Sequence, residues 1–376
     1  MKKILVTGSK GFIGKNLMVA LSRQENLRVT GFNSDDDISK LRAELKDVGI
    51  IYHLAGVNRP EKVEKFELEH VGLTHKILSL LAEHDRKPAI VMSSSIQAEL
   101  DNPYGVSKKK AEELLFDYGG NTGAPVYIFR LTNVFGKWCR PNYNSVVATF
   151  CYNISHDLPI AISDSERVME LVYIDDVVAG FLDILRADQR LPSEKYLTVS
   201  PTYKIKLGDL AEKIYQMKAV RETLIVPDLK DEFMKCLYAT YLSYLDKDDL
   251  SYLLDMKTDK RGSLAEVIKS EHFGQMFISK SHAGILRGNH YHDTKSEKFC
   301  VIKGRAVIKF RHILEEEVLS YHVSGEKIEV VDIPPGYTHS IENMADEEMI
   351  VLFWADQMFD SGRPDTYQNE VEREKN

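Results

Sequence analysis

The stretch KKILVTGSKGFIGKNLMVAL (residues 2–21) decides the fold of the first part of this chain. Residues 3–6 predict a buried strand, glycines follow it, and an apolar-periodic run then predicts a helix. Gly8, Gly11 and Gly14 would let the backbone turn tightly and approach a pyrophosphate, whose charge the start of the helix stabilises. A tight turn without a ligand is the alternative, but the strand before and the helix after favour nucleotide binding.

The same alternation of strand and helix continues beyond this stretch. Helical patterns such as THKILSLLAEH (74–84) lie between further apolar runs that predict strands: LRVTGF (27–32), VGIIYHLAG (48–56), PAIVMSSS (88–95) and VYIFRLTNVFG (126–136). Strands that alternate with helices indicate a doubly wound parallel sheet, in which each crossover supplies a covering helix. The aromatic residues of FMKCLYATYLSYL (233–245) recur at roughly helical spacing and predict a packed face.

The character of the sequence changes at about residue 258. The β-branched runs KFCVIKGRAVIKFRH (298–312), VLSYHVSGEKIEVVDIPPGYTHSI (318–341) and EEMIVLFWADQ (347–357) are separated by glycine, proline and charged turns. They predict short antiparallel strands in a sandwich or barrel. We therefore expect three parts: a nucleotide-binding domain, a charged junction and an all-β domain, over residues 1–245, 246–258 and 259–376.

Length and composition limit the classes of function. The 376 residues suit two domains, and 43% hydrophobic and 28% charged residues are ordinary for a globular protein. The formal net charge of −8 argues against nonspecific binding to nucleic acid. The four cysteines lie far apart, which favours free thiols in a reducing compartment. The first apolar run stops at residue 7, and no run is long enough for a membrane span, so we expect a cytoplasmic protein.

A Tyr-x-x-x-Lys pattern follows the fourth predicted strand. At positions i and i+4 of a helix, Tyr104 and Lys108 project from one face, and the ammonium can lower the pKa of the phenol for proton exchange with a carbonyl oxygen. Tyr291 and Lys295 match the same pattern in the β-rich part. The position after the strand favours the first pair, because the serines at 93–95 can donate a hydrogen bond to the same oxygen.

The end of the second predicted strand bears on the cofactor. An acidic residue usually stands there to bind the ribose 2′-hydroxyl of NAD, but this chain has Asn33, and acidic residues come only at 35–37. The missing carboxylate removes a repulsion toward a 2′-phosphate, so NADPH is favoured over NADH. Lys10 is the candidate partner for that phosphate.

Four residues in the β-rich part have the side chains of a metal site. His290 and His292 lie two apart on a predicted strand and therefore share a face. Glu297 and His339 would complete a set of three imidazoles and one carboxylate, which suits Zn, Fe, Mn, Ni or Cu. A solvated strand face is the alternative, but the Pro334-x-Gly-x-x-His339 segment, with its own histidine at a fixed offset, favours a metal.

The first 245 residues resemble the extended short-chain dehydrogenase/reductase family, in its sugar-nucleotide branch. The matching motifs are TGSKGFIG (7–14), HLAG (53–56), SSS (93–95), YGVSK (104–108), RLTNVFG (130–136) and VYIDDV (172–177). The resemblance implies that Tyr104 is the acid/base, that Lys108 holds the nicotinamide ribose, and that Ser94 or Ser95 assists. It implies cofactor contacts from Gly8, Lys10, Gly11, Phe12, Ile13, Gly14, Asn33, Asp37, Ile38, Leu54 and Ala55, and contacts to a nucleotide-sugar from Asn133 and Arg140.

Residues 258–360 resemble the cupin family, whose two motifs match the spacing around His290 and His339. DKRGSLAEV (259–267) and GILRGNHYH (284–292) are similar to the branch that contains dTDP-4-dehydrorhamnose 3,5-epimerase, which acts on 4-keto nucleotide-sugars. In that branch the histidine that matches His290 is a base, so His290 can be a base or a ligand; the full set of four favours a ligand, with zinc the expected metal. His282, His322 and Tyr337 are then candidates for the base that removes a C3 proton.

Together the two parts resemble the bifunctional enzymes of capsular-polysaccharide and O-antigen biosynthesis. That resemblance implies a homodimer that acts on a UDP-2-acetamido-2,6-dideoxy-4-ketohexose. The β-rich domain would epimerise C3, and the N-terminal domain would reduce C4 with NADPH to UDP-2-acetamido-2,6-dideoxy-L-talose, on the route to UDP-N-acetyl-L-fucosamine. Three alternatives stay open: a single-activity reductase with a structural β domain, an epimerase or dehydratase that recycles bound NAD, and a noncatalytic regulatory protein.

Overall fold

The chain folds into two compact units in a computed structural model that describes residues 1–59, 62–186, 191–192, 194–254, 257–259, 262–264, 268, 275–357 and 362–373. The first unit contains Met1–Val146 and Val168–Ile205, and the second contains Val147–Arg167 and Lys206–Asn376. The second unit thus takes in helical segments as well as the β-rich part. The boundaries of the folding domains stay a prediction.

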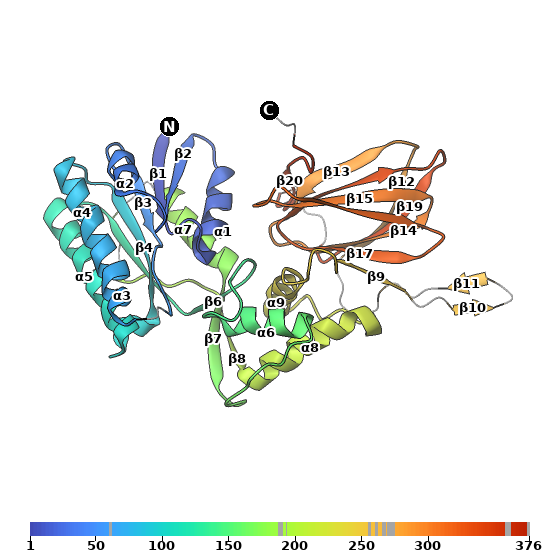
Figure 1. The fold of residues 1–376 in the computed structure, drawn as a ribbon, viewed down its shortest axis with the longest axis horizontal. Helices are drawn as coiled ribbons and strands as arrows, with labels where there is room; N and C mark the ends of the chain where they lie inside the picture. The colour runs from blue at the N-terminus through green and yellow to red at the C-terminus, as the bar shows by residue number, and fades with distance from the viewer. Residues whose placement is uncertain are drawn as a thin grey trace. The chain divides into compact units, whose positions relative to one another are not determined.

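A five-stranded parallel sheet forms the centre of the first unit (Figure 1). Its strands stand in the order β2 (Leu27–Phe32), β1 (Lys2–Thr7), β3 (Ile50–His53), β4 (Ala89–Ser95), β5 (Val126–Leu131). Ile4, Leu5 and Val6 are fully buried, because helices cover both faces of the sheet. The parallel doubly wound sheet predicted for this part is confirmed.

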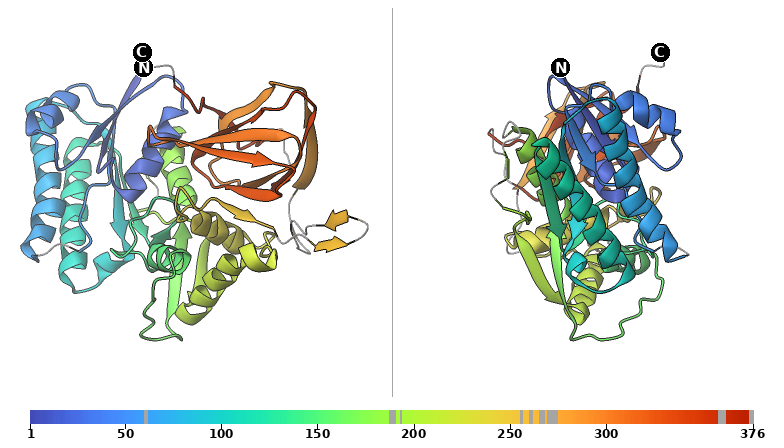
Figure 2. Two further views of the ribbon diagram at one scale, coloured as in Figure 1. Left: turned by 45° about the vertical axis from the view of Figure 1, so that its right-hand side comes forward. Right: turned by 90° about the vertical axis from the view of Figure 1, so that its left-hand side faces the viewer.

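The helices of the first unit lie on the two faces of that sheet. Helices α4 (Leu73–Glu83) and α5 (Pro103–Thr122) cover one face, and α1 (Phe12–Ser22) and α7 (Ile174–Arg186) cover the other (Figures 1 and 2). Shorter helical segments and a small second sheet complete the unit: α2 (Ile38–Glu44), α3 (Glu64–Phe66), a π-helix η1 (Glu67–Gly72), a 3₁₀ helix η2 (Ile96–Glu99), β6 (Asn133–Phe135), β7 (Val168–Tyr173) and β8 (Thr202–Lys206).

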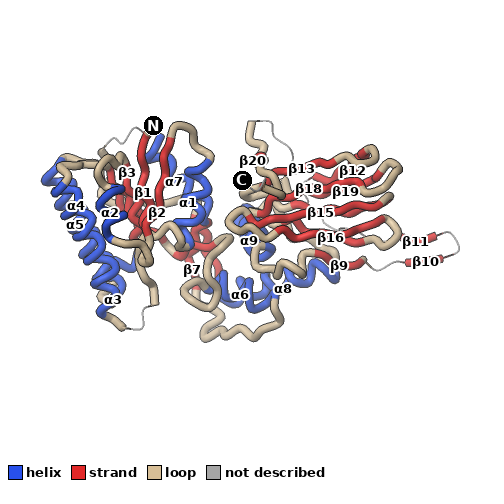
Figure 3. Tube along the Cα trace, turned by 45° about the horizontal axis from the view of Figure 1, so that its top comes forward, coloured by secondary structure: helices blue, strands red, loops and turns tan. Residues whose placement is uncertain are grey.

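Two five-stranded antiparallel sheets dominate the second unit (Figure 3). One has the order β12 (Gln275–Ser281), β19 (Met349–Ala355), β14 (Glu297–Lys303), β17 (Glu329–Ile333), β9 (Ser251–Leu253). The other has the order β16 (Val318–Ser324), β15 (Arg305–His312), β18 (Tyr337–Asn343), β13 (Leu286–Tyr291), β20 (Tyr367–Gln368). The short pair β10 (Lys257–Asp259) and β11 (Gly262–Leu264) stands apart from both sheets. The antiparallel all-β fold predicted for this part is confirmed.

The apolar side chains of the two sheets meet in one core. Phe299, Val301, Ile308, Phe310 and Phe353 are members of this cluster and are at most 7% exposed. They alternate along each strand with residues that face outward, as a sheet with one buried face requires. The segment DKRGSLAEV (259–267), which was matched to the epimerase branch, lies partly outside the described residues, since 260–261 and 265–267 are not described.

Among the described residues, the second unit also contains the helices α6 (Val146–Ser155, all but its first residue), α8 (Leu207–Thr223) and α9 (Glu232–Leu242). An ion cluster joins α8 to the sheet: the Asp332 carboxylate lies 2.5 Å from Lys298 Nζ and 3.2 Å from Arg221 Nη2 on α8. Strand β9, inside the predicted junction, pairs with β17. Tyr238 and Tyr241 of α9 are at most 3% exposed, which confirms the predicted packed face.

All four cysteines are free thiols, as predicted. Among the described residues, no helix is long and apolar enough to cross a membrane.

Candidate active sites

The glycine-rich turn after β1 depends on close backbone packing. Gly8 has a left-handed φ of +68°, and a Cβ there would lie 2.8 Å from the backbone of Ala55. A Cβ on Gly14 would lie 2.1 Å from the Gly8 carbonyl oxygen, so only glycine fits at the start of α1. Leu54 and Ala55 follow β3, the neighbour of β1. The predicted cofactor segments therefore meet where the strand order reverses, which is the usual place for a dinucleotide.

The residue after β2 is tied to this turn through its side chain. The Asn33 Oδ1 accepts a hydrogen bond from the Lys10 backbone N at 2.9 Å, and its Nδ2 donates to the Ser9 hydroxyl at 2.9 Å. The Lys10 ammonium lies 2.5 Å from an Asp35 carboxylate oxygen, with both side chains exposed. A neutral amide thus stands where NAD-type sites have a carboxylate, and a cation lies next to it.

The other predicted cofactor residues lie on the neighbouring helix starts. Gly11 is the N-cap of α1, and Phe12 and Ile13 form its half-buried first turn. Asp37 caps α2 by accepting a hydrogen bond from the Ser39 backbone N, and the exposed Ile38 opens that helix.

The two predicted nucleotide-sugar residues have separate surroundings. The exposed Asn133 on β6 donates from Nδ2 to the Glu170 carbonyl oxygen at 3.0 Å. The Arg140 guanidinium lies 5.2 Å from the ring centroid of Tyr143. No described contact joins Asn133 to Arg140, so their shared role stays a prediction.

Helix α5 brings Tyr104 and Lys108 to the end of β4. Two residues favour the start of the helix at this point: Asn102 caps it by accepting a hydrogen bond from the Gly105 backbone N, and Pro103 occupies the first turn. Gly105 allows close contact with η2, because a Cβ there would lie 2.1 Å from the Gln97 carbonyl oxygen. The start of α5 is therefore fixed against the segment that follows the serines.

Lys108 is almost fully enclosed. Its side chain is buried, and Nζ donates to the Ser93 carbonyl oxygen at 3.1 Å. Burial lowers the pKa of Lys108 to about 8, although the nearby Glu112 opposes this change. The surroundings of Lys108 Nζ therefore favour the neutral amine over the ammonium more than water does.

The Tyr104 phenol is half-buried beside Lys108 and Ser95. Burial raises its pKa to about 12, and the nearby Ser95 hydroxyl offsets only part of the rise. Lys108 Nζ is 5.9 Å from the ring centroid. Burial thus has the largest effect on the pKa of the phenol, and the lowering of that pKa by Lys108 stays a prediction.

The two candidate serines have different partners. Ser94 Oγ donates to the fully buried Glu112 carboxylate at 2.5 Å, and Arg130 Nη2 lies 2.6 Å from the other oxygen of that carboxylate. Ser95, by contrast, lies near the Tyr104 phenol, and its hydroxyl acts to lower the pKa of that phenol. Ser94 thus belongs to a buried ion network, whereas Ser95 lies beside the phenol of Tyr104.

No sequence pattern pointed to His70, which lies in the π-helix η1. Its Nε2 accepts a hydrogen bond from the Val57 backbone N at 3.2 Å, so Nδ1 carries the proton and donates to Ser107 Oγ at 2.8 Å. Ser107 Oγ in turn donates to the Tyr104 carbonyl oxygen at 2.8 Å. The His70 ring also lies edge-on to the Tyr104 ring, with the centroids 5.6 Å apart. His70 therefore fixes the helix turn that carries the phenol.

In the second unit, the structure brings together the four predicted metal ligands. One donor atom from each of His290, His292, Glu297 and His339 lies within 4.8 Å of the others. A β-bulge in β13 between Gly288 and His290 sets this geometry, because it places His290 opposite His339 of β18.

The hydrogen bonds of two histidines fix which nitrogen is free. His292 Nδ1 lies 2.6 Å from the Asp365 carbonyl oxygen, and His339 Nδ1 lies 3.2 Å from the Tyr337 carbonyl oxygen. A carbonyl can only accept, so both Nδ1 atoms carry protons and both Nε2 atoms have lone pairs. These Nε2 atoms are buried and have no hydrogen-bond partner among the described residues. The set therefore fits a divalent metal ion.

The charges of the cluster also suit a cation. Burial, together with the neighbouring His339 and His292, lowers the pKa of His290 to about 4, and burial likewise lowers the pKa of His339. Neutral imidazoles and an ionised carboxylate are the forms that bind zinc.

The candidates for the C3 base lie in different surroundings. His282 and His322 are exposed. Tyr337 is a buried member of the sandwich core, two residues before His339 on the same strand, and burial raises its pKa to about 12. Of these three, only Tyr337 shares the buried interior with the four candidate ligands.

Two family profiles match the chain, one in each half. The NAD-dependent epimerase/dehydratase family matches residues 4–199, and the polysaccharide biosynthesis C-terminal domain matches residues 257–367. The chain belongs to the NAD-dependent epimerase/dehydratase family, in a form that carries this second, polysaccharide-biosynthesis domain.

Relatives match along nearly the whole chain. A UDP-2-acetamido-2,6-beta-L-arabino-hexul-4-ose reductase of Pseudomonas aeruginosa is 45% identical over 365 residues, which are 97% of this chain and 98% of the relative. The crystal structure of the capsular polysaccharide assembling protein CapF from Staphylococcus aureus has 43% identity and a TM-score of 0.66, and it covers 98% of this chain and 100% of that one. The predicted resemblance to capsular-polysaccharide enzymes of this two-part kind is thus confirmed.

A more distant structure supports the fold alone. The UDP-glucuronic acid 4-epimerase of Bacillus cereus, solved with UDP-glucuronic acid and NAD, is 21% identical with a TM-score of 0.52, over 58% of this chain and 83% of that one.

Proposed function

We propose that this chain is a bifunctional nucleotide-sugar enzyme with one catalytic site in each unit. The second unit epimerises C3 of a UDP-2-acetamido-2,6-dideoxy-4-ketohexose, and the first unit reduces C4 with NADPH to give UDP-2-acetamido-2,6-dideoxy-L-talose, a precursor of UDP-N-acetyl-L-fucosamine. The full-length match to a hexul-4-ose reductase supports the reduction. The observation that carries the second activity is the cluster of His290, His292, Glu297 and His339, with two buried imidazole nitrogens free to bind.

In the first unit, Tyr104 gives its phenolic proton to the C4 oxygen of the sugar as the carbonyl becomes an alcohol. NADPH, when bound, supplies the hydride that C4 accepts. Ser95, which lies near the phenol, donates a hydrogen bond to the same oxygen, and Ser94 stays in the Glu112 network. The Lys108 ammonium binds the nicotinamide ribose and favours the phenolate that remains. The first unit would then rebind a proton at Tyr104 before the next cycle.

The cofactor preference rests on the end of β2. Asn33 brings no charge against a 2′-phosphate, and Lys10 is at hand to pair with it. We therefore expect kcat/KM to be higher with NADPH than with NADH. Replacing Lys10 by Glu should reverse the order, and an unchanged ratio would contradict this part of the proposal.

In the second unit, His290, His292, Glu297 and His339 would hold a divalent metal ion, with zinc favoured by the imidazole-rich set. When bound, such an ion would supply a Lewis acid for the C4 carbonyl, which would make the C3 proton more acidic. Tyr337 is the strongest of the three candidates for moving the C3 proton, because it lies in the buried interior beside His339. The two reactions belong together, since epimerisation needs the C4 ketone and reduction removes it.

Two variants separate the activities. The Tyr104→Phe variant should exchange the C3 hydrogen of the 4-keto sugar with deuterated water while it oxidises no NADPH. The His290→Ala variant should lose that exchange and its metal but keep the NADPH site. If exchange survives in His290→Ala, the second unit is not a metal-dependent epimerase, and a single-activity reductase with a structural β domain becomes the better account.

Stoichiometry tests the remaining alternatives. A reductase consumes one NADPH for each sugar, whereas an epimerase or dehydratase that recycles bound NAD consumes none. The expected homodimer is checked by light scattering coupled to size-exclusion chromatography, where a monomer mass would contradict it.

A further inference from the structure

The segment 362–373 returns to the strands that carry the candidate metal ligands. Its short strand β20 pairs with β13, so that Gln368 lies opposite His290 and Tyr367 opposite Tyr291. The Asn369 backbone N then donates to the Asn289 carbonyl oxygen at 2.8 Å. A segment more than 70 residues further along the chain is thus an edge of the sheet that holds His290.

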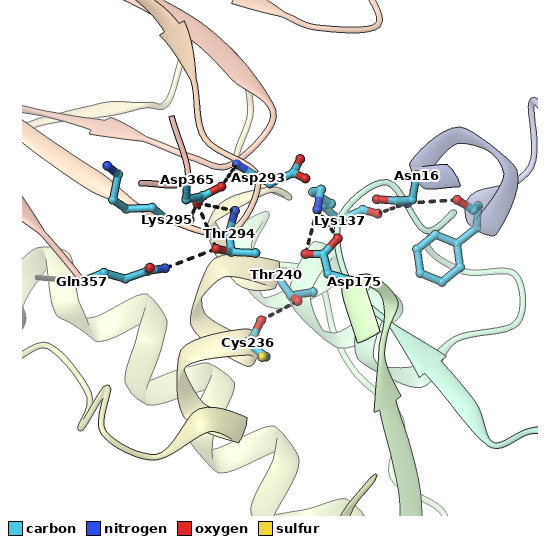
Figure 4. A network of polar contacts seen from close by, with 11 residues as sticks. Asn16, Lys137, Asp175, Cys236, Thr240, Asp293, Thr294, Lys295, Gln357 and Asp365 are labelled. Carbon is cyan, nitrogen blue, oxygen red and sulfur yellow. Dashed lines mark hydrogen bonds and ion pairs between the residues drawn. The ribbon is translucent and has the colours of Figure 1, made fainter. Parts of the chain in front are cut away.

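Asp365 contacts this site through both its backbone and its side chain. Its carbonyl oxygen lies 2.6 Å from His292 Nδ1. Its carboxylate accepts hydrogen bonds from the backbone N of Asp293 at 3.0 Å, Thr294 at 3.0 Å and Lys295 at 2.7 Å, and from Thr294 Oγ1 at 2.9 Å (Figure 4). These residues form the loop between the candidate ligands His292 and Glu297.

The segment is itself anchored by a buried guanidinium. Arg311 is 1% exposed; its Nε donates to the Val371 carbonyl oxygen at 3.0 Å, and its Nη2 donates to Asn369 Oδ1 at 2.8 Å. Thr338 Oγ1 donates to the Asn369 carbonyl oxygen at 2.6 Å. Arg311 lies on β15 and Thr338 on β18, which is also the strand of His339, so the segment is bonded to two strands of the sheet.

We infer that Asp365 is a positioning residue for the metal centre of the second unit. Its carbonyl keeps the proton of His292 on Nδ1 and leaves Nε2 free to bind, and its carboxylate fixes the loop that sets the spacing from His292 to Glu297. The inference rests on the proposed metal site. Outer partners of this kind orient a ligand and its tautomer, and their loss typically lowers metal affinity about 10- to 100-fold.

The test compares zinc affinity in Asp365 variants of the full chain. The apo protein is prepared with a chelator and titrated with Zn²⁺ against a competing indicator, and Co²⁺ absorption reports the ligand geometry. Asp365→Ala should bind Zn²⁺ about 10- to 100-fold more weakly than the wild type and change the Co²⁺ spectrum. Glu370→Ala is the matched control, because that exposed side chain lies on the same segment, and it should bind as the wild type does.

The Asp365→Asn variant separates the effect of losing the carboxylate from the effect of backbone strain. Asp365 has a left-handed φ of +40°, which alanine tolerates poorly and asparagine well. Asp365→Asn should keep the fold and part of the bonding, so that its Zn²⁺ affinity falls between those of the wild type and the alanine variant. A merely structural role would lower the melting temperature of the apo protein without this ordered loss of affinity.

The outcomes distinguish the two claims. If both Asp365 variants bind Zn²⁺ as the wild type does while His339→Ala does not, Asp365 has no positioning role and the metal site stands. If the wild type and His339→Ala bind Zn²⁺ alike, the metal site itself is wrong.

Discussion

The Lys108→Met substitution should make the first unit more stable while it removes the reductase activity. Lys108 is buried with an ammonium that lacks a carboxylate at contact distance among the described residues, and it donates one hydrogen bond, to Ser93. Methionine has a similar length and carries no charge. The substitution therefore removes the free-energy cost of burying the Lys108 ammonium, so the folded state should become more stable.

The size of the effect follows from the pKa of Lys108. Burial lowers it from 10.5 to about 8. At about 1.4 kcal/mol for each pKa unit, charging this lysine costs the folded state about 3 kcal/mol at pH 7. Loss of the hydrogen bond to the Ser93 carbonyl lowers the free energy of unfolding by about 1 kcal/mol and so offsets part of this gain. We expect a net gain of about 2 kcal/mol in the free energy of unfolding.

The stability gain from Lys108→Met should fall as the pH rises. Because the folded pKa is depressed, the folded protein binds fewer protons than the unfolded chain between about pH 8 and pH 10.5. The penalty is complete below pH 8 and disappears as the pH rises through 10.5. The advantage of Lys108→Met over the wild type should therefore be largest at pH 7 and shrink toward pH 10.

The two tryptophans allow the first unit to be observed alone. Trp138 belongs to the first unit and Trp354 to the second, so a Trp354→Phe background leaves fluorescence from Trp138 only. Urea unfolding at pH 7 and pH 10 then gives the two free energies. Lys110→Met is the control on the same helix, since the exposed Lys110–Glu67 pair contributes less than about 1 kcal/mol. A Lys108→Met protein that is less stable than the wild type at pH 7, or a difference that does not shrink with pH, would refute the reasoning.

Three further substitutions test the first unit. Tyr104→Phe should lower NADPH oxidation about 10²- to 10⁴-fold and leave NADPH binding intact, as measured by cofactor fluorescence. Glu112→Ala removes the buried carboxylate that pairs with Arg130 and leaves that guanidinium with the exposed Glu99 as its ion partner, so it should cost about 3 kcal/mol of unfolding free energy, against less than about 0.5 kcal/mol for the exposed Glu113→Ala. Gly14→Ala, whose Cβ would lie 2.1 Å from a backbone oxygen, should abolish cofactor binding, whereas Gly120→Ala, in open space within a helix, should raise the melting temperature.

The sequence predicts features that depend on local spacing. Gly8, Gly11 and Gly14 act within one turn, and Tyr104 and Lys108 are one helical turn apart, so their geometry follows from the elements that contain them. The clustering of the four candidate metal ligands could also be predicted, because strand alternation places His290 and His292 on one face and the spacing of two motifs adds Glu297 and His339.

Partners that are distant in sequence could not be predicted. Asp365 and His292 are 73 residues apart, and no motif links them. The choice between Ser94 and Ser95 depends on Glu112, a residue of the following helix, and the raised pKa of Tyr104 depends on the packing around it rather than on the Lys108 spacing. Such contacts come from tertiary packing, which a one-dimensional pattern does not contain.

The central claim is that one chain epimerises C3 and then reduces C4 of a 4-keto UDP-sugar. Its most direct test is to incubate the zinc-loaded enzyme with UDP-2-acetamido-2,6-dideoxy-4-ketohexose and NADPH in deuterated water and to locate deuterium in the product by NMR. Our account predicts deuterium at C3, hydrogen from NADPH at C4 and one NADPH consumed for each sugar. A reduced product with no deuterium at C3 would contradict it.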